Sequence, residues 1–134
     1  MVTTMRPGAE FECGLPWDSR RPEFPVSGTS VIRRSVVHWM LENGGEMAEI
    51  EYHVVDVFSE TALAGNPLAV VMDKAGLDRA HMQAIAREFN LSETTFVERR
   101  PAAVEQREGV RVRIFTTQEE LQFAGHPTLG TRAC

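Results

Sequence analysis

The sequence predicts an α+β domain built on a mixed or antiparallel sheet that starts near Met47. Three observations lead to this fold class. Short segments rich in β-branched residues, some with alternating apolar and polar positions, are typical of strands. One longer segment places its apolar residues at helical spacing. The connections between the predicted strands are mostly short enough for hairpins, which favours this class over a Rossmann fold.

Two strands are predicted first. Residues 49–58 (EIEYHVVDVF) are β-rich and partly alternating, and residues 68–72 (LAVVM) form a short apolar run. The loop between them ends in residues 64–67 (AGNP), a tight turn. Such a turn can present backbone N–H groups to a ligand, although more often it only connects two strands.

A helix follows these strands. Asp78 is suited to its N-cap and Asn90 to its C-terminal end. The apolar residues between them fall at positions i, i+3, i+4 and i+7: Met82, Ile85, Ala86 and Phe89. This spacing predicts a helix with one buried face.

Two further strands are predicted at residues 94–99 and 109–116. The second of these alternates cleanly. Its apolar face consists of Val110, Val112 and Ile114. Its polar face carries Arg111 and Arg113, which we expect to face solvent, as polar residues on one face of a sheet usually do.

The last predicted elements are a short strand at residues 121–123 and a helix that begins around Pro127. Proline is favoured at the first position of a helix because its ring fixes a helical φ. Glu119 and Glu120 precede the short strand. We interpret them as an exposed lead-in to it, with a second catalytic carboxylate as the alternative.

The N-terminal third of the chain lacks such regularity. Prolines and glycines are scattered through residues 1–46 rather than placed between periodic segments. Only residues 35–42 (SVVHWMLE) look locally helical. We therefore expect residues 1–46 to be a poorly ordered N-terminal extension and residues 47–134 to form the domain.

The composition restricts the class of protein. The chain has 134 residues, of which 43% are hydrophobic, and a net charge of −5 that offers no basic surface to nucleic acid. No segment approaches the roughly 18 apolar residues of a membrane span. A disulfide between Cys13 and Cys134 is conceivable, but a reducing cytoplasm is the simpler interpretation. The four histidines show no metal-ligand spacing, so no metal site is predicted.

Two residues at element junctions are candidates for chemistry. Glu93 lies between the predicted helix and the next strand, where its surroundings can tune it for proton transfer; the alternative is a solvated loop carboxylate. His126 lies at the start of the last helix and can bind an anion or relay a proton; the alternative is a helix cap on a surface turn. Ser92 is more typical of a turn hydroxyl than of a nucleophile.

Three stretches together resemble the N-terminal part of the phenazine-biosynthesis isomerase (PhzF-like) family. They are YHVVDVFSETALAGNPLAVV, MQAIAREFNLSETTFV and VRIFTTQEELQFAGHPTLGT, and the resemblance covers about residues 49–132. It implies a fold similar to that of diaminopimelate epimerase, with two related α+β domains that each wrap a curved mixed sheet around a central helix. The active site of such proteins lies between the two domains.

The resemblance also implies an activity. The best-known family member isomerises a dihydro-hydroxyanthranilate, and a single glutamate moves the proton without a cofactor. That glutamate corresponds to Glu93, and Gly125, His126 and Ser92 correspond to substrate-binding residues. The epimerases of this fold have a cysteine where this sequence has Ala124, which disfavours cysteine-based racemisation. The implied partners are a small-molecule substrate and, for the complete protein, a second copy in a homodimer; neither nucleic acid nor a membrane is implied.

Family members are roughly twice as long as the matching part, so the second domain is expected to be absent and the central helix truncated. The favoured interpretation is a fragment of a PhzF-like isomerase that is inactive alone. The alternative is a non-catalytic binding or assembly module that pairs with a separate chain.

Overall fold

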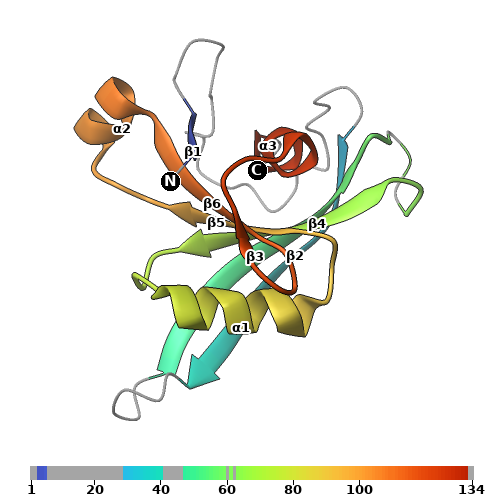
Figure 1. The fold of residues 1–134 in the computed structure, drawn as a ribbon, viewed down its shortest axis with the longest axis horizontal. Coiled ribbons are helices and arrows are strands. Elements are labelled where there is room, and N and C mark those ends of the chain that lie inside the picture. Colours follow the sequence, from blue (N-terminus) through green and yellow to red (C-terminus); the bar gives the residue numbers. More distant parts are fainter. Residues whose placement is uncertain (1–2, 6–28, 41–46, 60, 62, 133–134) are drawn as a thin grey trace.

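The computed structural model describes residues 3–5, 29–40, 47–59, 61 and 63–132, and within them the strands form one mixed sheet (Figure 1). The strands are β1 (Thr3–Met5), β2 (Thr29–Met40), β3 (Met47–Val57), β4 (Asn66–Asp73), β5 (Thr94–Glu98), β6 (Val110–Phe115) and β7 (Glu120–Leu121). The helices are α1 (Arg79–Phe89), α2 (Ala102–Glu108) and α3 (Gly125–Arg132). The predicted α+β class with a mixed sheet is therefore confirmed.

The strand order is β1-β6-β5-β4-β3-β2, and β7 pairs with β6 beside this path. Antiparallel pairs join β3 to β4, β5 to β6 and β6 to β7. Strands β4 and β5 are parallel, and α1 is the crossover between them. Because of this crossover, the junction after α1 and the start of β4 lie at the same edge of the sheet, with Thr94 opposite Ala69.

The local helix predicted at residues 35–42 is wrong, because β2 runs from Thr29 to Met40 and pairs antiparallel with β3 along its length. The segment holds several β-branched and aromatic residues, which suit a strand once a partner strand is available. Long-range pairing of this kind is invisible to a local pattern. The domain boundary expected at Met47, where β3 begins, stays a prediction. Cys13 and Cys134 lie outside the described residues.

Helices α1 and α3 lie on opposite faces of the sheet (Figure 1). Met82, Ile85 and Ala86 of α1 are buried and pack with one cluster, which includes Val71, Phe96 and Phe115, while Phe89 packs partly buried against it. The predicted buried face is therefore confirmed. The side chain of Asp78 accepts a hydrogen bond from the His81 N–H, and Asn90 ends α1 in the left-handed conformation, so both predicted caps are confirmed as well.

A second cluster fills the face toward α3. Its buried members come from four strands: Val55, Val57, Leu68, Val70, Val97, Val112 and Ile114. The predicted apolar face of β6 contributes Val112 and Ile114, with Val110 packed against the cluster. A sheet covered on both faces explains why β4 reads as a nearly continuous apolar run.

Helix α2 was not predicted. It occupies part of the connection between β5 and β6, and no residue of it is buried, so it leaves no apolar periodicity in the sequence. None of the helices described here is long and apolar enough to span a membrane.

Candidate functional site

Glu93 occupies the turn between α1 and β5, directly after the left-handed Asn90 that ends the helix. Glu93 immediately precedes Thr94, the first residue of β5. Thr95, two residues after Glu93, faces α3, and its hydroxyl oxygen accepts a hydrogen bond of 2.9 Å from the Thr131 hydroxyl. Because side chains alternate along a strand, Glu93 points to the same face of the sheet.

His126, the second residue of α3, is the partner of Glu93. Its Nδ1 atom lies 3.0 Å from Glu93 Oε2, although the two residues are 33 positions apart in the sequence. Both side chains are largely shielded, with 10% of His126 and 20% of Glu93 exposed to solvent. The structure thus brings together the two candidates for chemistry that the sequence singled out. A solvated loop carboxylate no longer describes Glu93.

The second imidazole nitrogen is engaged as well. His126 Nε2 lies 3.1 Å from the backbone oxygen of Asn66, the first residue of β4. The sequence predicts residues 64–67 as a turn that can present backbone N–H groups but more often only connects two strands; here the backbone oxygen of Asn66 contacts the site instead. No sequence signal identifies this contact, because a backbone oxygen is present at every residue.

These two contacts place different requirements on the two nitrogens of the His126 ring. A carbonyl oxygen only accepts, so His126 Nε2 must carry a hydrogen. In a neutral imidazole Nδ1 is then bare, and a carboxylate also only accepts. Both contacts are hydrogen bonds at once only when a proton also lies between Nδ1 and Glu93 Oε2.

The position of His126 depends on how closely α3 approaches the sheet. A side chain on Gly130 would place its Cβ 2.4 Å from Leu68 Cδ2 and 2.7 Å from Val57 Cγ2. Only glycine fits there without displacement of the strands. The buried hydrogen bond from Thr131 Oγ1 to Thr95 Oγ1 fixes the helix along β5. Helix α3 is thereby held against β3, β4 and β5 with its N-terminus beside Glu93.

The other two predicted site residues flank the pair without joining its hydrogen bonds. Ser92 is exposed and precedes Glu93. Gly125 is exposed at the first position of α3, and a Cβ there would meet no atom within 4 Å. Since Pro127 has no N–H, the N–H groups of Gly125 and His126 are the donors that this helix start can offer.

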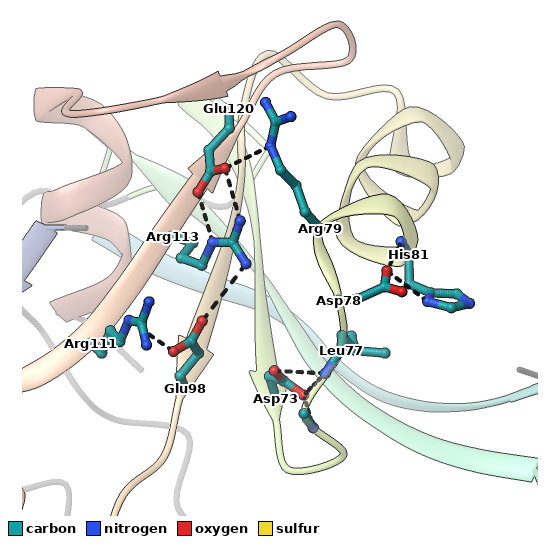
Figure 2. Close-up of polar contacts among 10 residues, drawn as sticks. Asp73, Leu77, Asp78, Arg79, His81, Glu98, Arg111, Arg113 and Glu120 are labelled. Carbon is teal, nitrogen blue, oxygen red and sulfur yellow. Dashed lines mark hydrogen bonds and ion pairs between the residues drawn. The ribbon is translucent and has the colours of Figure 1, made fainter. Parts of the chain in front are cut away.

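On the opposite face, a chain of charged side chains connects α1 to the strands that lead to His126 (Figure 2). Glu120 of β7 accepts two hydrogen bonds from Arg113, at 2.7 and 2.8 Å, and one from Arg79 of α1 at 3.0 Å. Glu98 continues the chain, 3.0 Å from Arg111 and 3.9 Å from Arg113.

The expectation that Arg113 faces solvent and that Glu120 is an exposed lead-in is wrong. Their side chains are 15% and 18% exposed, because each neutralises the other beneath α1. Hydrogen bonds from Arg113 lower the pKa of the Glu120 carboxyl, and the same contact raises the pKa of Arg113. Two more α1 side chains, Gln83 and Arg87, donate to the backbone oxygens of Thr116 and Thr117. Helix α1, which leads into Glu93, is thus tied to the β6–β7 hairpin, which leads into His126.

Within the described part of the chain, no three or more His, Cys, Asp or Glu side chains are grouped so that they could hold a metal ion. Of the other histidines, His81 contacts its own helix cap, Asp78, at 2.8 Å. The contacts of His126 with Glu93 and with the Asn66 carbonyl define the candidate site.

Comparison with known proteins supports the resemblance drawn from the three sequence stretches. The sequence model described as "Phenazine biosynthesis-like protein" (PhzC-PhzF) matches residues 55–134. An uncharacterized isomerase of Mesorhizobium japonicum is 58% identical over 80 residues, which are 60% of this chain and 26% of that protein. The trans-2,3-dihydro-3-hydroxyanthranilate isomerase of Pseudomonas aeruginosa is 52% identical over 81 residues, 60% of this chain and 27% of that one.

The solved structures agree. A phenazine biosynthesis PhzC/PhzF protein from Clostridium difficile superposes with a TM-score of 0.53 and 35% identity, over 61% of this chain and 29% of that chain. The chain therefore spans between a quarter and a third of the length of the relatives it matches. The expectation that family members are about twice as long as the matching part is wrong, because these relatives are longer than that.

Proposed function

Because this chain belongs to the phenazine biosynthesis-like PhzC-PhzF family, we propose that it supplies the acid/base half of an isomerase site. The reaction is a cofactor-independent proton shift between two carbon atoms of a small cyclic carboxylate. The observation that carries the proposal is the contact of 3.0 Å between Glu93 Oε2 and His126 Nδ1, which places an imidazole beside a shielded carboxylate.

Glu93 is the group that moves the proton. With the shared proton on His126, the Glu93 carboxylate is free to take a proton from a substrate carbon, and the C–H electron pair spreads into the conjugated system of the substrate. Glu93 then returns the proton to a different carbon, so that one C–H bond breaks, another forms and nothing is oxidised. The imidazolium stays beside Glu93 and offsets the negative charge that develops on the substrate between the two proton transfers.

The substrate carboxylate is bound at the start of α3. The N–H groups of Gly125 and His126 have no acceptor inside the helix, and the positive end of the helix dipole favours an anion there. Ser92 adds a hydroxyl at the exposed edge of the site, next to Glu93. Ala124, which precedes Gly125, has no ionisable group, so the site has one acid/base carboxylate and no thiol opposite it.

We propose that a second domain of the complete protein supplies the remainder of the site. This second domain is an α+β domain of the diaminopimelate-epimerase type and covers the α3 side of this sheet. The relative from Pseudomonas aeruginosa acts on trans-2,3-dihydro-3-hydroxyanthranilate. For this chain we propose the substrate class that this name exemplifies, a dihydroaromatic ring with a carboxylate.

Replacement of Glu93 tests the proposal. In the protein at its natural length, Glu93→Gln removes the base and is expected to lower turnover by roughly two to four orders of magnitude. It should also abolish the incorporation of solvent deuterium into the substrate, followed by mass spectrometry. The matched control is Glu88→Gln, an exposed glutamate near the end of α1, which should exchange like the wild type. Retained exchange in Glu93→Gln would exclude Glu93 as the base.

One observation favours a second candidate function, a non-catalytic module that pairs with a separate chain. Four large apolar side chains are exposed among the described residues: Phe58, Leu63, Phe123 and Leu129. If the wild-type protein catalyses no deuterium exchange with any dihydroaromatic carboxylate and is isolated in a stable complex with another chain, this second function is the correct one.

A further inference from the structure

Phe58 has a backbone conformation that is unfavourable for its side chain. It follows β3 directly, and its φ of 67° lies in the left-handed region. Glycine and asparagine enter this region readily, whereas a bulky aromatic residue there is a genuine outlier. Residues held in such conformations gather at functional sites when the surrounding structure imposes them.

The packing of the β3–β4 loop shows what imposes it. A Cβ on Gly65 would lie 2.5 Å from the Val57 oxygen and 3.1 Å from Ser59 Cβ, so the returning chain passes directly against the end of β3. The Ser59 hydroxyl bonds both the N–H and the oxygen of Thr61, which closes the loop further. The direction change after β3 therefore occurs at Phe58.

Burial does not compensate for this conformation. The side chain of Phe58 is 65% exposed, so it adds little to the core. Its ring lies beside His126 instead, with the ring centroids 5.8 Å apart and the planes inclined at 35°. An exposed aromatic face therefore adjoins the imidazole that contacts Glu93.

We propose that Phe58 is a specificity-determining residue that stacks on the ring of the substrate. Offset stacking between unsaturated rings occurs at centroid separations of about 4.5–7 Å. The centroid separation of Phe58 and His126 falls within this range. A flat or nearly flat ring with a carboxylate can contact Phe58 while its carboxylate reaches the start of α3. A saturated, puckered ring of the same size gains less from the aromatic face. This inference rests on the proposed function, because it assigns the ring subsite of the same site.

A binding comparison tests the proposal in the protein at its natural length. The probes are 3-hydroxyanthranilate, whose ring is flat, and cyclohexanecarboxylate, whose ring is puckered. Phe58→Leu keeps most of the bulk and removes the aromatic face. It should weaken the binding of 3-hydroxyanthranilate by about threefold to tenfold, measured by titration calorimetry. The affinity for cyclohexanecarboxylate should change by less than about twofold.

Leu63 provides the matched control, because it lies in the same loop with a φ of 66° and is 82% exposed. Leu63→Ala should leave the affinity for both probes unchanged. Equal losses for both probes in Phe58→Leu, or equal effects of the two variants, would overturn the proposal. So would a lowered unfolding temperature of Phe58→Leu with unchanged affinities, since Phe58 would then only pack against the rest of the protein.

Steady-state kinetics distinguish a failure of the Phe58 proposal from a failure of the proposed reaction on which it rests. Phe58→Leu should raise KM for a dihydroaromatic substrate by the same threefold to tenfold and leave kcat within about twofold, because the aromatic face touches the ring and not the moving proton. An unchanged KM alongside an inactive Glu93→Gln would overturn the role of Phe58 and leave the proposed reaction intact. Retained exchange in Glu93→Gln would overturn the reaction, while the probe comparison would still report on Phe58.

Discussion

The contact between Glu93 and His126 depends on a third group, the Asn66 carbonyl, which contacts Nε2 and so holds the imidazole in position. A histidine with a free second nitrogen could rotate or change tautomer and leave Glu93 without a proton partner. A single residue of α3 likewise determines where this helix lies on the sheet. Gly130 determines how near α3 approaches β3 and β4, and therefore where His126 lies.

Gly130→Ala is accordingly expected to destabilise the protein. The added methyl would lie 2.4 Å from Leu68 Cδ2 in a face that is already filled, and overpacking of this kind costs about 1–3 kcal/mol. Gly125→Ala is the matched control on the same helix, because its methyl would meet no atom within 4 Å. It should change the free energy of unfolding by less than about 0.5 kcal/mol. Denaturant titration of both variants gives the comparison, and equal stability of the two would contradict the close packing of α3.

At the scale of elements, α1 and the β6–β7 hairpin are joined by charge rather than by apolar packing alone. Glu120 is the centre of this connection, bonded to Arg113 within the hairpin and to Arg79 on the helix. Since α1 leads into Glu93 and the hairpin leads into His126, this connection joins the elements that carry the two ends of the site; Figure 2 shows its contacts among Arg79, Glu120 and Arg113.

This connection predicts a pH dependence of stability. The pKa of Glu120 is lowered in the folded state by its hydrogen bonds with Arg113, so its contribution is complete above the pKa of an unfolded glutamate, about 4.3, and is lost as the pH falls through the lower folded value. Glu120→Gln should therefore lower the free energy of unfolding by about 1–3 kcal/mol at pH 7 and flatten its decline below pH 4.3.

The neighbouring exposed glutamate supplies the control for this measurement. Glu119→Gln should leave both the stability at pH 7 and its acid dependence close to those of the wild type. Chemical unfolding at a series of pH values distinguishes the two variants. If Glu120→Gln keeps the acid slope of the wild type, the ion pair does not contribute in solution.

At the scale of the whole molecule, the chain spans 26% to 29% of the relatives compared above, and large apolar side chains are exposed on it. Glu93 and His126 nevertheless meet within this part of the family fold, on the face of the sheet that α3 covers.

We therefore expect the 134-residue chain purified alone to unfold without a cooperative transition and to catalyse no isomerisation. Both expectations are checked on one preparation, by differential scanning calorimetry and by deuterium exchange into a dihydroaromatic carboxylate. A sharp calorimetric transition accompanied by turnover would contradict them and show that this part of the fold suffices.

The sequence by itself determined most of the elements from Met47 onward, though not α2, and also the caps of α1 and the family, because caps and apolar periodicity depend on neighbours within a few residues. It also supplied Glu93 and His126 as separate candidates. Only the tertiary structure decided that they meet, across 33 residues, and that a carbonyl 60 residues from His126 contacts the second nitrogen of its ring. It likewise decided that residues 29–40 form a strand and that Arg113 turns from solvent to Glu120. The physical reason is the same in each case: the partner that changes the outcome is distant in the sequence, and no local propensity encodes it.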